Sequence, residues 1–137
     1  MTSNAPLPKA FPGDTVWVIC LCADWCHLCR DYREVIDTVA RGLTGFRGFQ
    51  FAWLDIEDHA GMVGEMDIET FPTLLVADAA GMLFFGALTP QASILRRLLE
   101  SLAGAAPKRQ PHTAATQSLV QALPAQPQLH LRSPENP

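Results

Sequence analysis

Short apolar runs alternate with amphipathic stretches between residues 15 and 104. The run VWVICLC at 16–22 is continuously apolar and too short for a stable helix. Such a run is typical of a strand that is buried on both faces of a parallel sheet. The stretch after it has apolar residues at helical spacing and predicts a helix that closes near Gly42 and Gly45. These apolar residues are Leu28, Tyr32, Val35, Ile36, Val39 and Leu43.

The rest of this region predicts three more strands and a final helix. FQFAWLD at 49–55 is a strand candidate, which a right-handed crossover would place parallel to the first. Short strands at 73–77 and 82–85 are joined by a turn whose length favours an antiparallel hairpin. A helix with a leucine-rich face then ends at Gly104. The order βαβ, then ββα, predicts an α/β fold with a mixed four-stranded sheet flanked by helices.

The two ends of the chain lack this patterning. Residues 1–14 contain three prolines and no hydrophobic period, so we expect a flexible lead-in. Residues 105–137 hold six of the eleven prolines and only four charged side chains. This composition predicts a disordered tail, with one or two amphipathic turns around 116–123. We therefore expect one folded domain over 15–104, a size that can bury its own core.

Composition narrows the class of protein. The chain of 137 residues is 48% hydrophobic and 18% charged, with a formal net charge of -4. This balance is typical of a globular, mildly acidic protein and does not favour nucleic acid or an anionic membrane as a partner. No segment approaches the roughly 18 apolar residues of a transmembrane helix.

The cysteines suggest where the protein works. All four lie within residues 20–29, unlike the dispersed disulfide framework of a small secreted protein. No small-residue cleavage pattern precedes them, so 16–23 does not resemble the apolar core of a signal peptide. We expect a cytoplasmic protein, because in a reducing compartment such a cluster indicates redox work or metal binding.

The motif ADWCHLC at 23–29 carries the strongest chemical signal. In C-x-x-C the second cysteine lies one helical turn after the first, so the sulfurs of Cys26 and Cys29 can form a disulfide. Because a strand feeds a helix here, the sulfur of Cys26 meets the positive end of the helix dipole, which favours the thiolate. Cys26 would then attack a substrate disulfide and Cys29 would resolve the mixed disulfide. Half of a zinc site, or two buried core thiols, remain alternatives for an isolated C-x-x-C.

The segment from about Thr15 to Gly104 resembles thioredoxin. The resemblance lies in ADWCHLC, LDIED at 54–58, FPT at 71–73 followed by LLVA, and Gly86-Ala87 before the last helix. It implies a thioredoxin-like fold and a thiol–disulfide oxidoreductase in which a cis-proline, at Pro72, faces the cysteine pair. The backbone of Phe71 would then be free to pair with an extended substrate, like an added strand.

Several positions depart from the thioredoxin pattern. The chain has no room before Val16 for the first strand and helix of full-length thioredoxin, which leaves one sheet edge exposed or covered by the lead-in. The resemblance puts Cys20 where the family has a buried aspartate, and Trp53 where it has the lysine paired with that acid. Cys20 and Cys22 point to one face of their strand, and we expect Cys20 to lie below Cys29. They are buried core thiols, an auxiliary thiol pair that relays the disulfide, or half of a four-thiolate metal site.

The residues around the cysteine pair are candidates for substrate binding. They are Trp25, His27, Leu28, Phe71 and Pro72. His27 stands where thioredoxin has glycine. Its imidazole either favours the thiolate of Cys26 and raises the reduction potential, or is exposed to solvent with little effect.

We therefore expect a monomeric oxidoreductase that forms or reduces protein disulfides through Cys26 and Cys29, without cofactor or metal. Its partners would be protein disulfide substrates and a reducing or oxidising partner protein, and neither nucleic acid nor membrane. A thioredoxin-like binding or chaperone-like module with little redox turnover is the alternative. A metal site that uses Cys20, Cys22, Cys26 and Cys29 is the third hypothesis.

Overall fold

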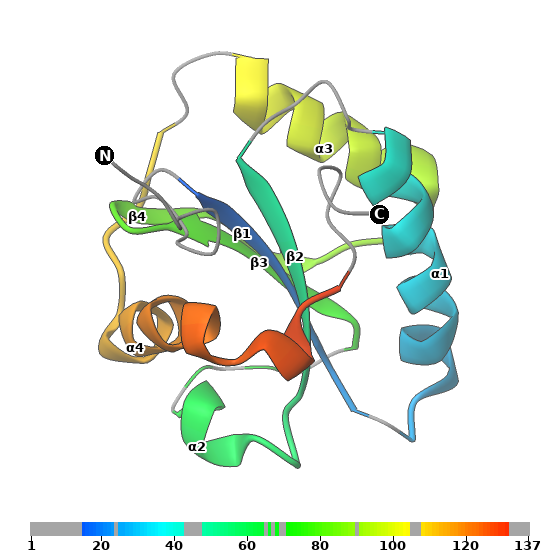
Figure 1. The fold of residues 1–137 in the computed structure, drawn as a ribbon. Helices are drawn as coiled ribbons and strands as arrows, with labels where there is room; N and C mark the ends of the chain where they lie inside the picture. Colours follow the sequence, from blue (N-terminus) through cyan, green and yellow to red (C-terminus); the bar gives the residue numbers. More distant parts are fainter. Residues whose placement is uncertain are drawn as a thin grey trace, which may run out of the picture.

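The computed structural model describes residues 15–23, 25–42, 48–64, 66, 68, 71–89, 91–104 and 108–131. The predicted lead-in at 1–14 lies outside these residues. The described chain forms four strands and four α-helices (Figure 1). In chain order they are β1 (Val16–Cys22), α1 (His27–Gly42), β2 (Phe49–Asp55), α2 (Ala60–Val63), β3 (Thr73–Asp78), β4 (Gly81–Ala87), α3 (Ala92–Gly104) and α4 (Ala114–Ala122), followed by two 3-10 turns, η2 (Leu123–Ala125) and η3 (Pro127–Leu129).

The strands form one mixed sheet in the order β2-β1-β3-β4. Strand β2 runs parallel to β1, with Val16 opposite Phe49. Strand β3 is antiparallel to β1, and β4 is antiparallel to β3. Helices α1 and α3 lie on one face of the sheet, while α2 and α4 lie on the other (Figure 1). The predicted α/β class, the four-stranded mixed sheet and the hairpin are confirmed. Among the described residues, no helix has both the length and the apolar character needed to cross a bilayer.

Strand β1 lies in the middle of the fold and supplies both halves of the core. Successive side chains of a strand point to opposite faces of its sheet. Val18, Cys20 and Cys22 accordingly belong to the core beneath α1 and α3. Trp17, Ile19 and Leu21 belong to the second core, beneath α2 and α4. Burial on both faces explains why this strand is continuously apolar, as the sequence predicted.

Helix α1 covers the first core with the predicted face, apart from its first turn. Tyr32, Ile36 and Val39 are buried as expected, but Leu28 is exposed. Cys29 takes the inward position instead, because one residue further along a helix turns the side chain by about 100°. The predicted apolar position Leu43 lies outside the described residues.

The prediction of a disordered tail over 105–137 is wrong for residues 108–131, which we call the C-terminal strap. Helix α4 and the two 3-10 turns pack on the sheet face opposite α1 (Figure 1). The strap buries apolar side chains against Trp17, Ile19 and Leu21 of β1. These strap side chains are Leu119, Val120, Leu123 and Leu129.

The strap also pairs with both outer strands of the sheet. Gln110 and Met82 of β4 exchange backbone hydrogen bonds at 2.8 Å in each direction. At the opposite edge, His130 bridges to Ala52 of β2, and the N–H of Leu131 donates to the carbonyl of Phe51 at 2.8 Å. Unpaired strand edges favour aggregation, so this pairing protects the sheet. The outer edge of β2 is therefore covered in part by the C-terminal strap.

Local sequence explains how a proline-rich segment folds. Thr113 and Thr116 form a capping box at the start of α4, in which each side chain accepts a hydrogen bond from the other residue's backbone N–H. Pro124 and Pro127 lie in the first turns of η2 and η3, where a missing N–H breaks no helical hydrogen bond. Neither proline therefore interrupts α4, which ends at Ala122.

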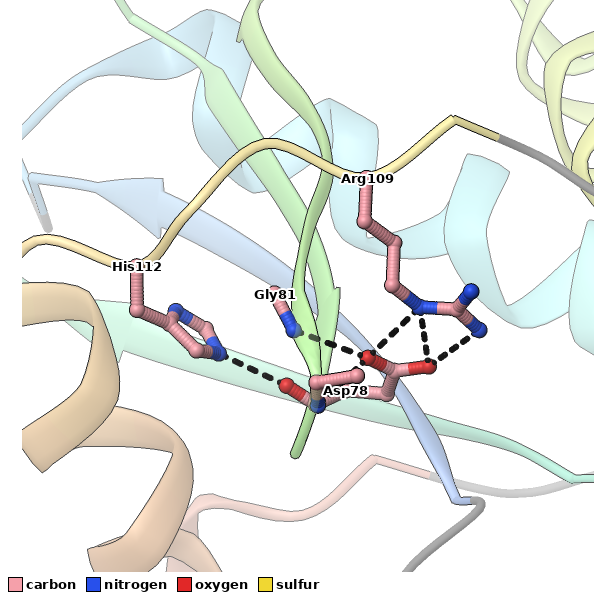
Figure 2. A network of polar contacts seen from close by, with 5 residues as sticks. Asp78, Gly81, Arg109 and His112 are labelled. Atoms are coloured by element: carbon pink, nitrogen blue, oxygen red, sulfur yellow. Dashed lines mark hydrogen bonds and ion pairs between the residues drawn. The ribbon is translucent and has the colours of Figure 1, made fainter.

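Asp78, at the turn between β3 and β4, anchors the start of the strap (Figure 2). Its carboxylate accepts hydrogen bonds from Nε and Nη2 of Arg109, at 2.9 and 2.7 Å to Oδ2. The same carboxylate accepts from the turn N–H groups of Ala80 and Gly81. His112 donates from Nε2 to the Asp78 carbonyl at 2.7 Å, and its Nδ1 lies 2.8 Å from the Thr116 hydroxyl. One residue thus joins the hairpin turn to the strap.

The Asp78 anchor should make stability depend on pH. Burial alone would raise the pKa of Asp78, but hydrogen bonds from Arg109 and the turn N–H groups outweigh it and hold the pKa below its ordinary value. A depressed pKa in the folded state contributes stability above the unfolded value of about 3.9, which is lost as pH falls through the folded value. We expect Asp78→Asn to be less stable than wild type at pH 7, and the difference to shrink as the pH falls below the unfolded value of about 3.9. Urea unfolding at several pH values measures this, and parallel pH curves for the two proteins would contradict it.

Candidate active site

The junction between β1 and α1 presents Cys26 and Cys29 differently. Cys26 immediately precedes α1, its N–H donates to the Ala23 carbonyl at 3.0 Å, and its carbonyl accepts from Arg30 at 3.2 Å. It is therefore the N-cap residue, next to backbone N–H groups that α1 leaves without helical partners. Its side chain is partly accessible, whereas Cys29, one turn later, is fully buried. The pair has one exposed and one protected sulfur.

The loop before β3 lies beside this junction. The peptide bond between Phe71 and Pro72 is cis. Leu21 of β1 is opposite Thr73 of β3, so the antiparallel register brings Cys22 and Pro72 to the same end of the strand pair. The rings of Phe71 and Trp25 meet edge to face at 5.7 Å between centroids. The Pro72 loop and the residues before Cys26 are therefore in contact.

Residues predicted to bind substrate lie around Cys26. Trp25 is 60% exposed and Leu28 54% exposed, so two large apolar side chains face solvent on either side of Cys26 in the chain. The indole N–H of Trp25 donates to Glu57 at 3.1 Å, which fixes the ring beside the site. His27 is exposed at the first position of α1, and Phe71 is half-buried while Pro72 is buried. All five predicted residues thus belong to the region around Cys26.

The four thiols form a chain of contacts from the surface into the core. The Sγ atoms of Cys20 and Cys22 are 3.0 Å apart. Cys29 is buried in the same core cluster as Cys22, with Cys26 packed against that cluster, and burial and hydrogen bonding with both thiols raise its pKa. The prediction that Cys20 lies below Cys29 needs correction, because Cys22, two residues nearer the start of α1, makes this contact. Among the described residues, no group of three or more His, Cys, Asp or Glu side chains is arranged to hold a metal ion.

Burial and mutual contact keep the inner thiols neutral. The hydrogen bond with Cys20, followed by burial, raises the pKa of Cys22 far above its usual range. Burial, followed by the hydrogen bond with Cys22, does the same to the pKa of Cys29, against an opposing hydrogen bond from the Ala23 backbone. Both side chains are thiols in the reduced protein at neutral pH. The accessible Cys26 is therefore the residue placed to act as the first nucleophile.

Sequence reasoning missed the buried phenol beneath these thiols. Tyr32 lies on the inward face of α1, one turn after Cys29, and its hydroxyl is buried without a hydrogen-bond partner. Burial raises its pKa, and negative charge on Cys20 or Cys22 would raise it further, so its hydroxyl is within electrostatic reach of both sulfurs. The signal in the sequence was the hydroxyl of Tyr32, a polar atom on a helix face that is otherwise apolar.

Cys20 and Trp53 are uncharged side chains at the positions where the resemblance to thioredoxin puts a buried aspartate and its paired lysine. Cys20 and Trp53 are direct neighbours across β1 and β2. Trp53 packs at the margin of the first core, and the guanidinium of Arg33 lies 5.2 Å from its ring centroid. Trp17 is buried in the second core, and its ring lies 5.1 Å from that of His130 in the strap.

Comparison with known proteins identifies the family. The family model described as Thioredoxin matches residues 9–91, more than half of the chain. The chain belongs to the thioredoxin family. No curated protein matches it significantly.

Several solved structures share its fold, and two of those described next are thioredoxins. Thioredoxin from Trypanosoma brucei brucei is 22% identical, with a TM-score of 0.55 over 67% of this chain and 78% of that one. Thioredoxin from Malassezia sympodialis is 20% identical, with a TM-score of 0.58 over 70% and 82%. Human ERp44 is 17% identical, with a TM-score of 0.60 over 68% of this chain but only 29% of its own length. At these identities the comparison establishes the fold alone.

Proposed function

We propose that the protein is a thiol–disulfide oxidoreductase that acts on protein disulfides through Cys26 and Cys29. The observation that carries the proposal is an accessible thiol at the N-cap of α1, hydrogen-bonded to a fully buried thiol one turn later. The accessible position lets a substrate disulfide reach the outer sulfur, and the buried position protects the inner one from outside reagents. Membership of the thioredoxin family supports a redox role in general.

The proposed reaction has two exchange steps. The thiolate of Cys26 attacks one sulfur of a substrate disulfide, forming a mixed disulfide and releasing the other substrate sulfur, which takes up a proton. Cys29 then loses its proton and attacks the Sγ of Cys26, which releases the second substrate thiol and leaves Cys26 and Cys29 joined. A partner dithiol restores the reduced pair by the reverse sequence. The same steps run backwards form a disulfide in the substrate.

The surroundings of Cys26 favour an extended, partly apolar substrate segment. The exposed side chains of Trp25 and Leu28 supply apolar contact area beside the reactive sulfur. The backbone next to Pro72 would pair with the substrate as an added strand does. A monomeric state, a cytoplasmic location and the identity of the partner proteins stay predictions.

Two other functions stay as alternatives. A thioredoxin-like binding module would use the same surface without turnover, and dithiothreitol-driven insulin reduction would then remain at background. A thiolate metal site would need all four sulfurs at about 2.3 Å from one ion. The thiols follow one another from Cys20 through Cys22 and Cys29 to Cys26 and do not surround one point. This arrangement favours disulfide exchange over a metal site.

Replacing Cys26 with serine tests the proposed function. Wild type should accelerate the reduction of insulin by dithiothreitol, and Cys26→Ser should lose roughly 100-fold or more of that acceleration, because no other thiol is as accessible. Cys20→Ala is the matched control, since it also removes one sulfur but from a fully buried position, and it should retain activity. Equal rates for Cys26→Ser and wild type would contradict the proposal.

A further inference from the structure

Cys22 is the one inner thiol that contacts the proposed reactive pair from below. It ends β1, is fully buried and belongs to the core cluster that also contains Cys29. Its sulfur is hydrogen-bonded to Cys29 on one side and lies 3.0 Å from Cys20 on the other. A sulfur in contact with one member of a disulfide is placed to exchange with it, because exchange needs only approach of the attacking sulfur to that atom.

We propose that Cys22 is a third exchange thiol, which takes over the disulfide from Cys26 by forming a bond with Cys29. The proposal rests on the proposed function, since it begins from the oxidised Cys26–Cys29 pair. It gives the oxidised protein a second form, with a buried Cys22–Cys29 disulfide and a reduced Cys26 at the surface.

The step is an isomerisation that needs no external oxidant or reductant. Cys22 releases its thiol proton to solvent and its sulfur attacks the Sγ of Cys29. The bond between the sulfurs of Cys22 and Cys29 forms while the bond between those of Cys29 and Cys26 breaks. The electron pair of the broken bond stays on Cys26, which takes up one proton from solvent. One disulfide and one thiol are present before and after the step.

The structure favours this direction of attack. The leaving sulfur of Cys26 lies at the N-cap of α1, where the helix dipole stabilises negative charge. The unpartnered hydroxyl of Tyr32 is within electrostatic reach of Cys22 and is available to donate to it as charge develops.

A relay of this kind has a consequence at the surface. While the disulfide is held between Cys22 and Cys29, both of its sulfurs are fully buried, so reductants in solution have poor access to them. Cys26 is meanwhile free to react, although the protein still carries one disulfide. The oxidised protein would therefore be alkylated at Cys26, which a two-cysteine site does not allow.

Thiol mapping in the Cys20→Ala variant tests the relay. This variant keeps Cys22, Cys26 and Cys29, so one equivalent of diamide leaves one disulfide and one free thiol. The free thiol is blocked with N-ethylmaleimide in acid denaturant, and chymotrypsin, which cleaves after Leu21, Trp25 and Leu28, separates the three cysteines for mass spectrometry. We expect both Cys22-blocked and Cys26-blocked protein, the latter at one part in a hundred or more. Blocking at Cys22 alone, with the Cys26–Cys29 disulfide present, overturns the relay and leaves the proposed function standing.

A double variant separates the geometry of the relay from the reactivity of Cys26. Cys20→Ala with Cys26→Ser contains only Cys22 and Cys29, and mild oxidation should remove both free thiols without forming dimers. Cys20→Ala with Cys22→Ala and Cys26→Ser is the matched control and should keep its single thiol. If the first variant keeps two free thiols while its circular dichroism spectrum matches wild type, the relay is wrong. If no disulfide forms at Cys29 in wild type either, the proposed function itself fails.

Discussion

Replacing Cys29 with serine should stop the reaction at a mixed disulfide between Cys26 and the substrate. Serine nearly preserves the size of the side chain, but a hydroxyl does not displace a thiolate from a disulfide. Cys29 is the inner thiol beside Cys26, so its loss leaves the mixed disulfide unresolved unless an outside thiol is added. We expect turnover of insulin to fall by roughly 100-fold, while covalent adducts of the variant accumulate.

Non-reducing electrophoresis and intact mass measure these adducts. A dithiothreitol-sensitive adduct on Cys26 is expected for Cys29→Ser and should be absent from the double variant that also carries Cys26→Ser. Cys20→Ala is the control for the inner thiols, because Cys20 takes no part in either exchange step and the variant should turn over as wild type does. Full turnover by Cys29→Ser, or a lack of any adduct, would contradict the assigned roles.

Ending the chain at Gly104 should abolish the folded monomer. The C-terminal strap shares one face of the sheet with α2, and its removal exposes much of the second core, including Trp17, Ile19 and Leu21. The truncation also leaves Met82 of β4 and Phe51 of β2 without their strap hydrogen bonds. An apolar face with two open edges favours aggregation over a stable domain. We expect the shortened chain to be insoluble or to unfold without a cooperative transition.

A single substitution in the strap gives a measurable version of this effect. Leu123 is fully buried in the second core, so Leu123→Ala should reduce the free energy of unfolding by about 2–5 kcal/mol. Gln121→Ala, on the exposed side of α4, is the matched control and should change it by less than about 0.5 kcal/mol. Urea unfolding measures both. A truncated chain with the unfolding transition of wild type would show that the strap contributes nothing to the fold.

Hydrophobic pattern predicted the central fold because its signals are local. The uninterrupted run of β1 reflects burial on both faces, and the periodicity of α1 reflects one buried face. The strap was missed because its proline content outweighed a weak helical pattern. Thr113 and Thr116 were the available capping signal, but where α4 docks depends on contacts such as Arg109 with Asp78, which are 31 residues apart.

The sequence predicted the part of the candidate site that depends on local spacing and missed the part that depends on how the chain turns. The spacing of Cys26 and Cys29 is a local property of a helix start, and the sequence therefore identified the pair. Which thiol of β1 touches Cys29 depends instead on where the chain turns from the strand into α1. That turn brings Cys22, not Cys20, against Cys29, and it also places the hydroxyl of Tyr32 beneath the thiols.

Equilibration in glutathione buffers of known potential tests the central claim most directly. Free thiols are alkylated at each potential and counted by intact mass, so that the result does not depend on which sulfur partners Cys29. We predict a reversible loss of two thiols per chain. If the exposed His27 favours the thiolate of Cys26, the midpoint lies between roughly -270 and -180 mV, and a value at or below -270 mV removes that role for His27. Four free thiols at every potential would contradict a redox-active pair at Cys26 and Cys29.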